Sequence, residues 1–473
     1  MHYDATMIKQ AFNPYLPSWE YIPDGEPHVF NDRVYIFGSH DFFNGYVFCL
    51  GDYVCYSAPI NNLSDWRYEG IIYGRTDDPL NKDGKMCLYA PDVTVGPDGK
   101  YYLYYALDKV PVVSVAVCDT PAGRYKFLGY VHYKDGTRVG EKEGDMPQFD
   151  PAVLTEGNTT YLYTGFCGQG MMDRKGAMAM AIGPDMLTVE NDYNVIIPGV
   201  MYGKGTSFEE HEFFEAPSIR KIGDTYYFVY SGRVMHELCY ATSKNPLEGF
   251  TYGGVIVSNC DLNIDTYKKA DMPAAYGANN HGGIILINGE WYIFYHRHTN
   301  GTWYSRQGCA EKIKILPDGS IPQVEITSCG LNGKPLVGEG FYPGYIACNM
   351  FVEGKPAKYL GDLTLPKIMQ DGKDGDENEG YIANVQDGAF FGFKYFDCKN
   401  VHSFSVTTRG YIKGTFEIRT KWDGDVLGTV DCDFSNVWET YKAKADIPDG
   451  VNAIYLTFRG TGNGHLKGFS LDK

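Results

Sequence analysis

Residues 26–37 read EPHVFNDRVYIF, in which a short strand with a proline leads through an Asn-Asp turn into a second strand that carries aromatic residues. Strand-forming residues on both sides of a short turn predict a β-hairpin. The unit occurs five times, and its further copies begin at Ala90, Asp150, Glu215 and His281. A unit that recurs at a regular interval indicates a repeat architecture.

The interval between the copies is roughly 60 to 67 residues, which suits a four-stranded sheet with long loops. Five such units predict an all-β chain that begins with a five-bladed β-propeller, for which we expect residues 1–328. The composition agrees, because 39 Tyr and 26 Phe favour strands and 56 Gly supply turns.

Acidic residues occupy one equivalent position in several copies. The first strand of each blade lines the propeller axis, so equivalent residues of different blades converge there. The position about 11 or 12 residues before the tyrosine of each second strand holds Asp24, Ala90 or Pro91, Asp150, Glu215 and His281. Asp24 alone is an ordinary turn residue, but three carboxyl groups at one place are unfavourable unless they have a task. Asp92 lies one residue past this position, and we expect it to be structural.

Hydrolysis of a glycosidic bond is a task that fits such a cluster. It needs one carboxylic acid to protonate the leaving oxygen and one carboxylate to activate water or attack carbon. Glu215 lies in an apolar strand, and a neighbouring Asp150 would raise its pKa further, so we expect Glu215 to be the general acid. Asp24 is then the general base, and Asp150 modulates the pKa of the acid and orients it.

The net charge and the cysteines limit the partners and the compartment. A net charge of −17 disfavours nucleic acid and acidic membranes, which recruit Lys and Arg, so we expect a neutral substrate. The N-terminus lacks a signal-peptide pattern, and the 12 Cys are scattered without CxxC pairs. We therefore expect reduced thiols and a cytoplasmic protein.

Two further motifs are incomplete. His211 lacks the second histidine of a metalloprotease helix, and residues 199–205 fall one residue short of a phosphate loop. We therefore expect neither zinc-dependent hydrolysis nor nucleotide binding.

Four short motifs resemble glycoside hydrolase family 43 over about residues 10–325. They are the base motif PDGEPHVF at residues 23–30 followed by YIFGSHD at 35–41, LYAPD at 88–92, FDP at 149–151 and FEAP at 214–217. The resemblance implies a five-bladed propeller with Asp24 as base, Asp150 as pKa modulator and Glu215 as acid. Tyr89 stands where the family usually has a tryptophan, and the resemblance implies that it faces the sugar.

The resemblance also bears on ions and on substrate contacts. His281 matches an axial histidine that helps to hold a hydrated Ca²⁺ or another ion through water, with a hydrogen-bonded core histidine as an equal alternative. The chemistry itself requires no cofactor. Arg297 and Arg306 are candidates to contact substrate hydroxyl groups, although ion pairing is an equal alternative for both.

The family pattern implies a particular activity. It is that of an exo-acting inverting enzyme that releases terminal α-L-arabinofuranosyl residues, and also β-D-xylosyl residues, from hemicellulose-derived oligosaccharides such as arabinoxylan and xylan fragments. An endo-arabinanase and a non-catalytic sugar-binding propeller remain as alternatives.

The blade motif stops after about residue 330. Alternating strands such as residues 415–419 and 453–458 predict a β-sandwich of jelly-roll type over residues 329–473. This part resembles a family 6 carbohydrate-binding module. Five aromatic residues are available either to stack on sugar or to fill the core: Phe390, Phe391, Tyr395, Trp438 and Tyr441.

Overall fold

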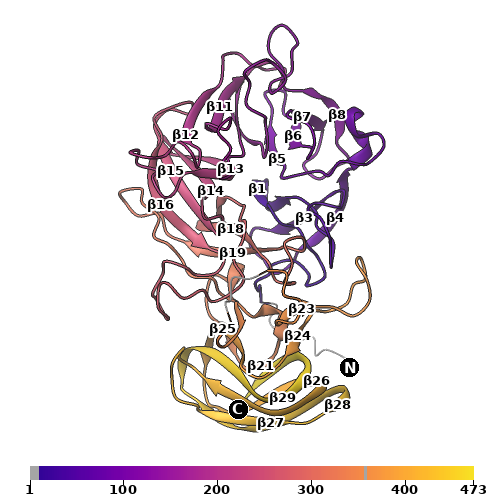
Figure 1. Ribbon diagram of the computed structural model, residues 1–473, viewed down its shortest axis with the longest axis vertical. Coiled ribbons are helices and arrows are strands. Elements are labelled where there is room, and N and C mark those ends of the chain that lie inside the picture. Colours follow the sequence, from indigo (N-terminus) through magenta and orange to yellow (C-terminus); the bar gives the residue numbers. More distant parts are fainter. Residues whose placement is uncertain (1–9, 356–359) are drawn as a thin grey trace.

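The computed structural model describes residues 10–355 and 360–473. Five sheets form a ring around a central axis, and a second β-rich part lies beside this ring (Figure 1). The predicted all-β fold, with a five-bladed propeller followed by a β-rich domain, is confirmed. The first nine residues, where the predicted propeller domain begins, lie outside the described residues.

Four blades have four antiparallel strands each, and the fifth has three. The first two blades comprise β1 (Glu26–Phe30), β2 (Arg33–Phe37), β3 (Tyr53–Pro59), β4 (Arg67–Tyr73), and then β5 (Asp92–Val95), β6 (Tyr101–Ala106), β7 (Val113–Cys118) and β8 (Lys126–Tyr130). The third and fourth comprise β9 (Ala152–Glu156), β10 (Thr159–Thr164), β11 (Gly176–Ile182), β12 (Asn194–Pro198), and then β13 (Phe213–Ile222), β14 (Thr225–Gly232), β15 (Glu237–Ser243) and β16 (Thr251–Ser258). The fifth comprises β17 (Ile284–Ile287), β18 (Glu290–Arg297) and β19 (Gln307–Ile313).

The repeated hairpin forms the inner pair of strands in every blade. In the first blade Glu26 pairs with Phe37 and Phe30 pairs with Arg33. Asn31 at the turn has φ of 57°, the left-handed conformation that such a tight hairpin turn requires and that asparagine tolerates. The local sequence therefore determines the turn, and the turn determines the register of the two strands.

The ring closes at the fifth blade. The innermost strands β1, β5, β9, β13 and β17 are neighbours in that order, and β17 also contacts β1. The segment before the first blade runs along β19, where Tyr15 N donates to Gly308 O at 3.1 Å. The Asn13 side chain donates to Ala310 O at 2.8 Å. This segment therefore covers the strand edge that a three-stranded blade would otherwise expose.

Buried side chains fill the spaces between adjacent blades. Phe37, Tyr53, Leu103 and Tyr105 pack together between the first and second blades. Each fully buried side chain of this size contributes about 1.5–3 kcal/mol to folding. The twelve cysteines all lie in the described part of the chain, where each is free and eleven are buried, in agreement with the prediction of reduced core thiols.

Ten strands form the second part of the chain. They are β20 (Leu336–Gly338), β21 (Gly340–Pro343), β22 (Asn349–Val352), β23 (Lys367–Met369), β24 (Tyr381–Val385), β25 (Ala389–Cys398), β26 (Val401–Arg419), β27 (Gly428–Cys432), β28 (Ser435–Ile447) and β29 (Gly450–Asp472). Four short 3-10 helices complete the described structure: η1 (Arg75–Asp77), η2 (Pro79–Asn81), η3 (Gly330–Asn332) and η4 (Gly344–Ile346). The predicted boundary at 328/329 falls between β19 and β20 and stays a prediction.

The long strands β26 and β29 bend together at paired glycines. Gly410 pairs with Gly464, and a Cβ atom at Gly462 would lie 1.6 Å from Tyr411 O, so no larger residue fits there. The bend folds the sheet into two layers that share one core. In this core the ring of Phe393 of β25 packs against that of Phe469 of β29, with centroids 4.7 Å apart. This layered arrangement agrees with the sandwich pattern, whereas the likeness to a carbohydrate-binding module stays a prediction.

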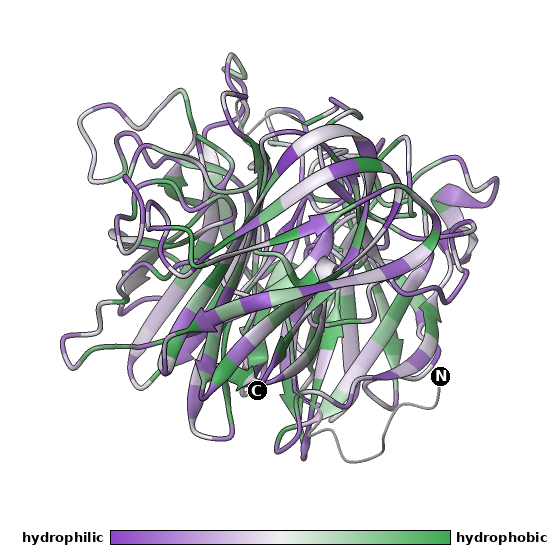
Figure 2. Cartoon of the chain, turned by 90° about the horizontal axis from the view of Figure 1, so that it is seen from below, coloured by the Kyte–Doolittle hydropathy of each residue, from purple (hydrophilic) through white to green (hydrophobic). Residues whose placement is uncertain are grey.

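Hydrophobic and hydrophilic residues occupy different parts of the fold. Seen from the side of the second part, hydrophobic residues gather in the strands and hydrophilic residues in the loops and at strand ends (Figure 2). Within residues 10–355 and 360–473, the structure has no helix that is long and apolar enough to cross a membrane.

Candidate active site

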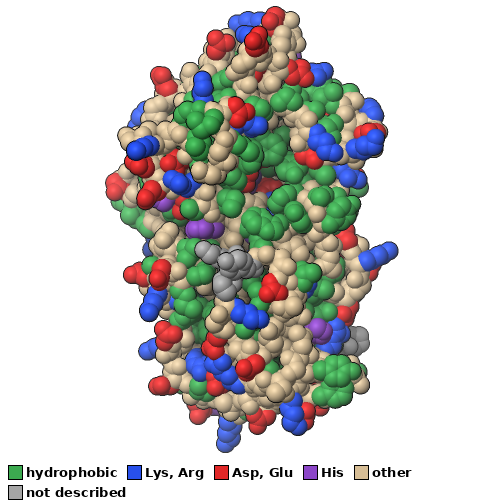
Figure 3. All heavy atoms as spheres, in the orientation of Figure 1, with side chains coloured by type: hydrophobic (Ala, Val, Ile, Leu, Met, Phe, Trp, Pro, Cys, Tyr) green, Lys and Arg blue, Asp and Glu red, His purple; other side chains and the backbone are tan. Residues whose placement is uncertain are grey.

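Asp24, Asp150 and Glu215 line one cavity of about 280 Å³ in the propeller. Asp24 lies two residues before β1, Asp150 two residues before β9, and Glu215 is the third residue of β13. Asp24 and Asp150 are 5% and 4% exposed. Figure 3 shows acidic side chains at the bottom of a hollow that hydrophobic side chains border. The shared position in the repeat thus brings the three predicted acids together.

The backbone is unusual at each acid. Asp24 has φ of 57° and Asp150 has φ of 47°, so equivalent residues of two blades adopt the left-handed conformation. Ala216, directly after Glu215, has φ of 67°, and the pairing of β13 with β14 shifts register on both sides of Glu215. Such conformations cost about 1–3 kcal/mol each and concentrate at functional sites, where they aim a side chain away from the regular strand direction.

Arg306 determines the charge of Asp24. Its Nη1 donates to Asp24 Oδ1 at 2.9 Å, and both groups are buried. Burial would raise the pKa of Asp24, but the guanidinium outweighs it and holds this pKa well below its usual range. The Asp24 carboxyl group is therefore ionised over the whole working range of pH.

A second carboxylate fixes Arg306 in place. Asp41 accepts from Arg306 Nε at 2.8 Å and from Nη2 at 3.0 Å, a two-pronged pair of hydrogen bonds. Asp41 Oδ1 also accepts from Cys49 N at 2.9 Å. The sequence argument did not assign a role to Asp41, although this residue ends the segment that resembles the family's base motif.

The pKa values of Glu215 and Asp150 are raised, in contrast to that of Asp24. Burial and the nearby Asp24 carboxylate raise the pKa of Glu215 to about 8. Burial, together with the charges of Glu215 and Asp24, raises the pKa of Asp150 well above its usual value. The cavity therefore holds one ionised carboxylate and a pair of carboxyl groups that retain protons near neutral pH.

Two histidines lie beside the acids. His281 Nδ1 is 3.9 Å from both Asp24 Oδ1 and Asp150 Oδ2, which is beyond hydrogen-bond distance. Burial lowers the pKa of His281 to about 4, so its ring is neutral. His296 Nδ1 accepts from Asp24 N at 3.2 Å, and Nε2 faces Asn279 O at 2.8 Å. These contacts fit an imidazole that is protonated on Nε2 and that supports the Asp24 backbone.

Aromatic rings form a continuous wall around the cavity. Successive ring centroids lie 4.9 to 6.5 Å apart along the series Tyr304, Phe48, Tyr89, Phe149, Phe166 and Phe214. The sequence argument identified only Tyr89 of these. A signal was available, because Tyr89, Phe149 and Phe214 each precede the axial position in three consecutive blades. Trp303 and Met235 also line the cavity.

The two predicted arginines have different locations. Arg306 lines the cavity, whereas Arg297 is absent from the lining residues. Arg297 Nη2 instead donates to Ala347 O at 3.0 Å and to Cys348 O at 3.1 Å, in the second part of the chain. This corrects the prediction of substrate contact for Arg297. Side chains alternate along β18, so Arg297 points away from the side on which His296 meets Asp24.

One layer of polar groups lies below the acids along the axis. Asp92 accepts from Val153 N at 2.8 Å and lies 2.6 Å from His28 Nε2, in agreement with the structural role expected for it. Atoms of Glu26, His28 and Asp92 lie close enough together to surround a cation. A Cβ atom at Gly283 would lie 2.4 Å from Ser218 Oγ and 2.9 Å from Glu26 Oε1, so glycine leaves oxygen-lined space there.

The aromatic residues of the second part are divided between core and surface. Phe390 and Phe391 are buried, and Tyr395 OH donates to Glu325 Oε1 at 2.7 Å. Trp438 packs against Tyr381 with ring centroids 5.4 Å apart. Core packing thus accounts for Phe390 and Phe391, and sugar stacking by the others stays a prediction.

An ionised carboxylate and a protonated carboxyl group that share an aromatic-walled cavity carry out glycosidic bond hydrolysis, which places the chain among the glycoside hydrolases. The family comparison agrees, because residues 27–321 match the model described as glycosyl hydrolases family 43. The chain belongs to that family.

Individual relatives cover between 66% and 98% of the chain. It is 68% identical over 472 residues to a "Xylosidase/arabinosidase" from Thermoclostridium stercorarium, covering 98% of this chain and 99% of that protein. A solved arabinoxylan arabinofuranohydrolase from Bacillus subtilis, in complex with cellotetraose, shares the fold with TM-score 0.52 and 21% identity over 98% of this chain and 97% of its own. A β-xylosidase/α-arabinofuranosidase from a compost microbial metagenome, in complex with xylotriose and in calcium-free form, has TM-score 0.51 and 27% identity over 66% and 97%.

Proposed function

We propose that this glycoside hydrolase is exo-acting and inverting, and that it releases terminal α-L-arabinofuranosyl and β-D-xylosyl residues from xylan and arabinoxylan fragments. The observation that carries the hydrolytic step is the opposite protonation of Asp24 and Glu215 in one cavity, since cleavage of a glycosidic bond needs an ionised carboxylate and a protonated carboxyl group. The match to family 43 supports inversion. The name of the relative at 68% identity supports the choice of these two pentoses.

The reaction proceeds in one displacement. Asp24 accepts a proton from a water molecule while the water oxygen forms a bond to the anomeric carbon on the face opposite the leaving group. The bond from that carbon to the glycosidic oxygen breaks, and Glu215 gives its proton to this oxygen. Asp24 ends protonated and Glu215 ends ionised, and exchange with solvent restores both groups.

Asp150 and Arg306 hold the two reacting groups in their required states. Asp150 lies in the same cavity as Glu215, and repulsion between their two negative charges opposes ionisation of both, which favours the protonated acid. Arg306 favours the ionised base through its ion pair with Asp24. These roles are positional and electrostatic, because neither group exchanges a proton with the substrate in the step described.

The cavity suits a neutral terminal sugar. A volume of about 280 Å³ suits one sugar residue, and a second cavity of about 520 Å³ adjoins it through shared residues such as Glu215 and Phe149, which gives room for the rest of an oligosaccharide. Tyr89 and the neighbouring rings offer apolar faces for stacking on the sugar, while Arg306 and the acids offer groups that bind hydroxyls. The free thiols support a cytoplasmic location.

A hydrated Ca²⁺ near the axis fits the polar layer below the acids. Ca²⁺ prefers carboxylate and other oxygen ligands, and Glu26, Asp92 and Ser218 supply them below His281. Such an ion would add positive charge beneath the acids. The proton transfers at Asp24 and Glu215 proceed through this chain's own residues.

The test compares leaving groups. Glu215→Gln and Asp24→Asn are assayed on nitrophenyl α-L-arabinofuranoside, nitrophenyl β-D-xyloside and xylobiose, with the wild type alongside. Nitrophenolate leaves without protonation, so Glu215→Gln loses much less activity on the nitrophenyl sugars than on xylobiose. Asp24→Asn loses at least about 10²-fold on all three substrates. Equal losses in Glu215→Gln on all substrates would exclude Glu215 as the acid, and undiminished activity would exclude the site.

A further inference from the structure

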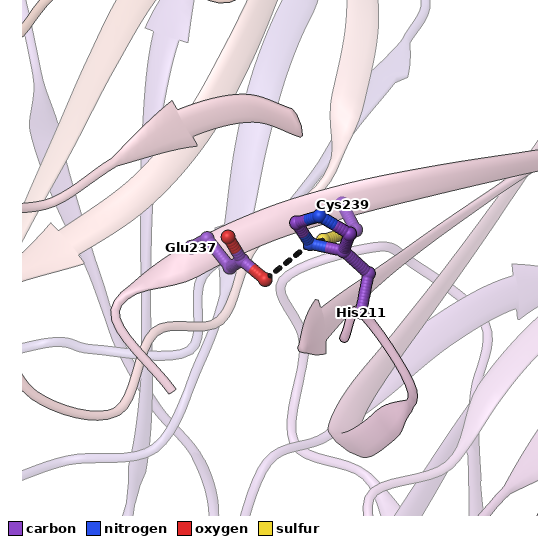
Figure 4. A group of neighbouring side chains, drawn as sticks. All are labelled: His211, Glu237 and Cys239. Carbon is purple, nitrogen blue, oxygen red and sulfur yellow. Dashed lines mark hydrogen bonds and ion pairs between the residues drawn. The ribbon is translucent and has the colours of Figure 1, made fainter. Parts of the chain in front are cut away.

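A second cluster of reactive side chains lies in the fourth blade, outside the cavity. His211 lies two residues before β13, and Glu237 and Cys239 are the first and third residues of β15. Residues two apart in a strand point to the same side, so Glu237 and Cys239 both face His211 (Figure 4). These three residues are absent from the lining of the cavity and take no part in the proposed hydrolysis.

The three side chains offer ligand atoms at almost the spacing that a metal ion requires. His211 Nδ1 lies 2.8 Å from Glu237 Oε1 and 3.9 Å from Cys239 Sγ, and all ligand atoms lie within 4.8 Å of one another. A tetrahedral zinc ion with ordinary bond lengths places nitrogen and oxygen ligands about 3.3 Å apart and nitrogen and sulfur about 3.5 Å apart. Shifts of about half an ångström per side chain would therefore suffice.

Among the residues that the structure describes, one oxygen of the Glu237 carboxylate lacks a partner. Glu237 is 1% exposed, and its Oε2 makes no hydrogen bond within the described part of the chain. A buried carboxylate oxygen without a partner is unfavourable, and a cation would satisfy it. A Cβ atom at Gly232 would lie 2.5 Å from Glu237 Oε1, so glycine leaves the space in which this carboxylate lies.

Neighbouring tyrosines orient the histidine. The ring of Tyr252 stacks on that of His211 with centroids 4.7 Å apart and an interplanar angle of 12°. Tyr230 OH donates to His211 O at 2.8 Å and fixes its backbone. The stacked ring and this hydrogen bond together hold His211 in place. The His211 side chain is 28% exposed, which leaves a path from solvent to the cluster.

We propose that His211, Glu237 and Cys239 form a binding site for a divalent metal ion of the zinc class. Nitrogen, oxygen and thiolate sulfur together favour Zn²⁺ or Co²⁺ over Mg²⁺ and Ca²⁺, which prefer oxygen ligands alone. Three protein ligands leave a fourth position for water on the exposed side. The site ties the start of β13, which carries Glu215, to β15, and it does not depend on the proposed hydrolytic activity.

The test measures binding of Zn²⁺ and Co²⁺ to the purified full-length protein after treatment with a chelator. We expect one Zn²⁺ per chain by calorimetry, and with Co²⁺ a thiolate charge-transfer absorption band in the near ultraviolet. Cys239→Ser and His211→Gln each weaken Zn²⁺ binding at least about tenfold, and Cys239→Ser also abolishes the band. Cys118→Ser, which removes a partly exposed thiol elsewhere, leaves both results unchanged.

Several results would overturn the site. They are absence of Zn²⁺ binding to the wild type, binding unchanged in both Cys239→Ser and His211→Gln, or binding that is lost in Glu215→Gln instead, which would place the ion among the catalytic acids. His211 is partly exposed, so His211→Gln keeps the test valid if replacement of buried Cys239 prevents folding. Zn²⁺ should also raise the melting temperature of the wild type and not that of His211→Gln.

Discussion

Arg306 makes the carboxyl groups in one cavity differ in their ionisation. Its guanidinium contacts Asp24 directly, whereas at Glu215 and Asp150 burial and the nearby Asp24 carboxylate outweigh its effect and raise the pKa. Three buried acids would otherwise share the same tendency to remain protonated. A single cation placed beside one of them therefore creates the difference between base and acid, and Asp41 holds that cation in position.

Replacement of Arg306 by methionine tests this arrangement. Without the guanidinium, burial and the neighbouring acids raise the pKa of Asp24, so the acidic limb of kcat/KM against pH, which lies below the working range of pH in the wild type, moves upward into it. The basic limb, which reports loss of the proton from Glu215 at about 8, remains present. Arg33→Met, which removes a hydrogen bond to Ser57 away from the cavity, is the control. An unchanged acidic limb in Arg306→Met would contradict the role of Arg306.

Glu215 also makes stability depend on pH. Its folded pKa of about 8 lies above the unfolded value, so its contribution is fully present below the unfolded pKa and is lost as pH rises through about 8. Glutamine does not titrate, so Glu215→Gln should gain stability relative to wild type as pH rises. We expect a melting temperature at least about 2 °C higher than that of wild type near pH 9, and a smaller difference near pH 5. A difference independent of pH, measured by calorimetry, would show that Glu215 is not buried as a proton-holding acid.

The bent strands β26 and β29 depend on glycine for a geometric reason. Gly462 has φ of 86°, and an added Cβ would collide with Tyr411 O at 1.6 Å. Gly450→Ala is a matched comparison, because Gly450 has φ of 104° but no atom within 4 Å of the added Cβ. Gly462→Ala should lower the free energy of unfolding by about 2–4 kcal/mol more than Gly450→Ala, measured by urea denaturation. Equal losses would mean that backbone conformation alone, and not the close approach, requires glycine.

The repeated hairpins could be predicted because their turns and strands are encoded locally. Asn31 and the residues around it determine one turn and one register, and five copies determine the blades. The same offset located Asp24, Asp150 and Glu215. The pairing of Asp41 with Arg306 joins residues of the first and fifth blades, and only the closed ring brings them together. The prediction that Arg297 contacts the substrate was wrong because the sequence does not indicate which face of β18 packs against the second part of the chain.

The second part of the chain supports the catalytic cavity directly. The loop after β18, which carries Trp303, Tyr304 and Arg306, is bound along one side by β23 and the segment before it. Ile368 N donates to Thr299 O at 2.8 Å, and Asn300 Nδ2 donates to Ile368 O at 2.8 Å. Phe43 N, in the first blade, donates to Asp374 Oδ1 at 2.6 Å. Two sides of the cavity therefore depend on contacts outside the propeller.

Asn300→Ala should weaken this support without touching the reacting groups. We expect kcat/KM on nitrophenyl β-D-xyloside to fall about tenfold, because small displacements of Trp303 and Arg306 misplace the sugar. Asn452→Ala is the control, since Asn452 Nδ2 donates to Pro448 O at 2.6 Å within the second part itself. An equal fall in both variants would indicate general destabilisation instead of support of the cavity.

The stereochemistry of the first product tests the assignment of Asp24 and Glu215 most directly. Wild-type enzyme acts on nitrophenyl β-D-xyloside while proton NMR follows the anomeric signals from the first moments of the reaction. With Asp24 delivering water opposite to the bond that Glu215 cleaves, α-D-xylose appears first and the β anomer follows by mutarotation. Initial release of β-D-xylose would mean a covalent intermediate, with Asp24 attacking the anomeric carbon, and would contradict the role of Asp24 as the base that activates water.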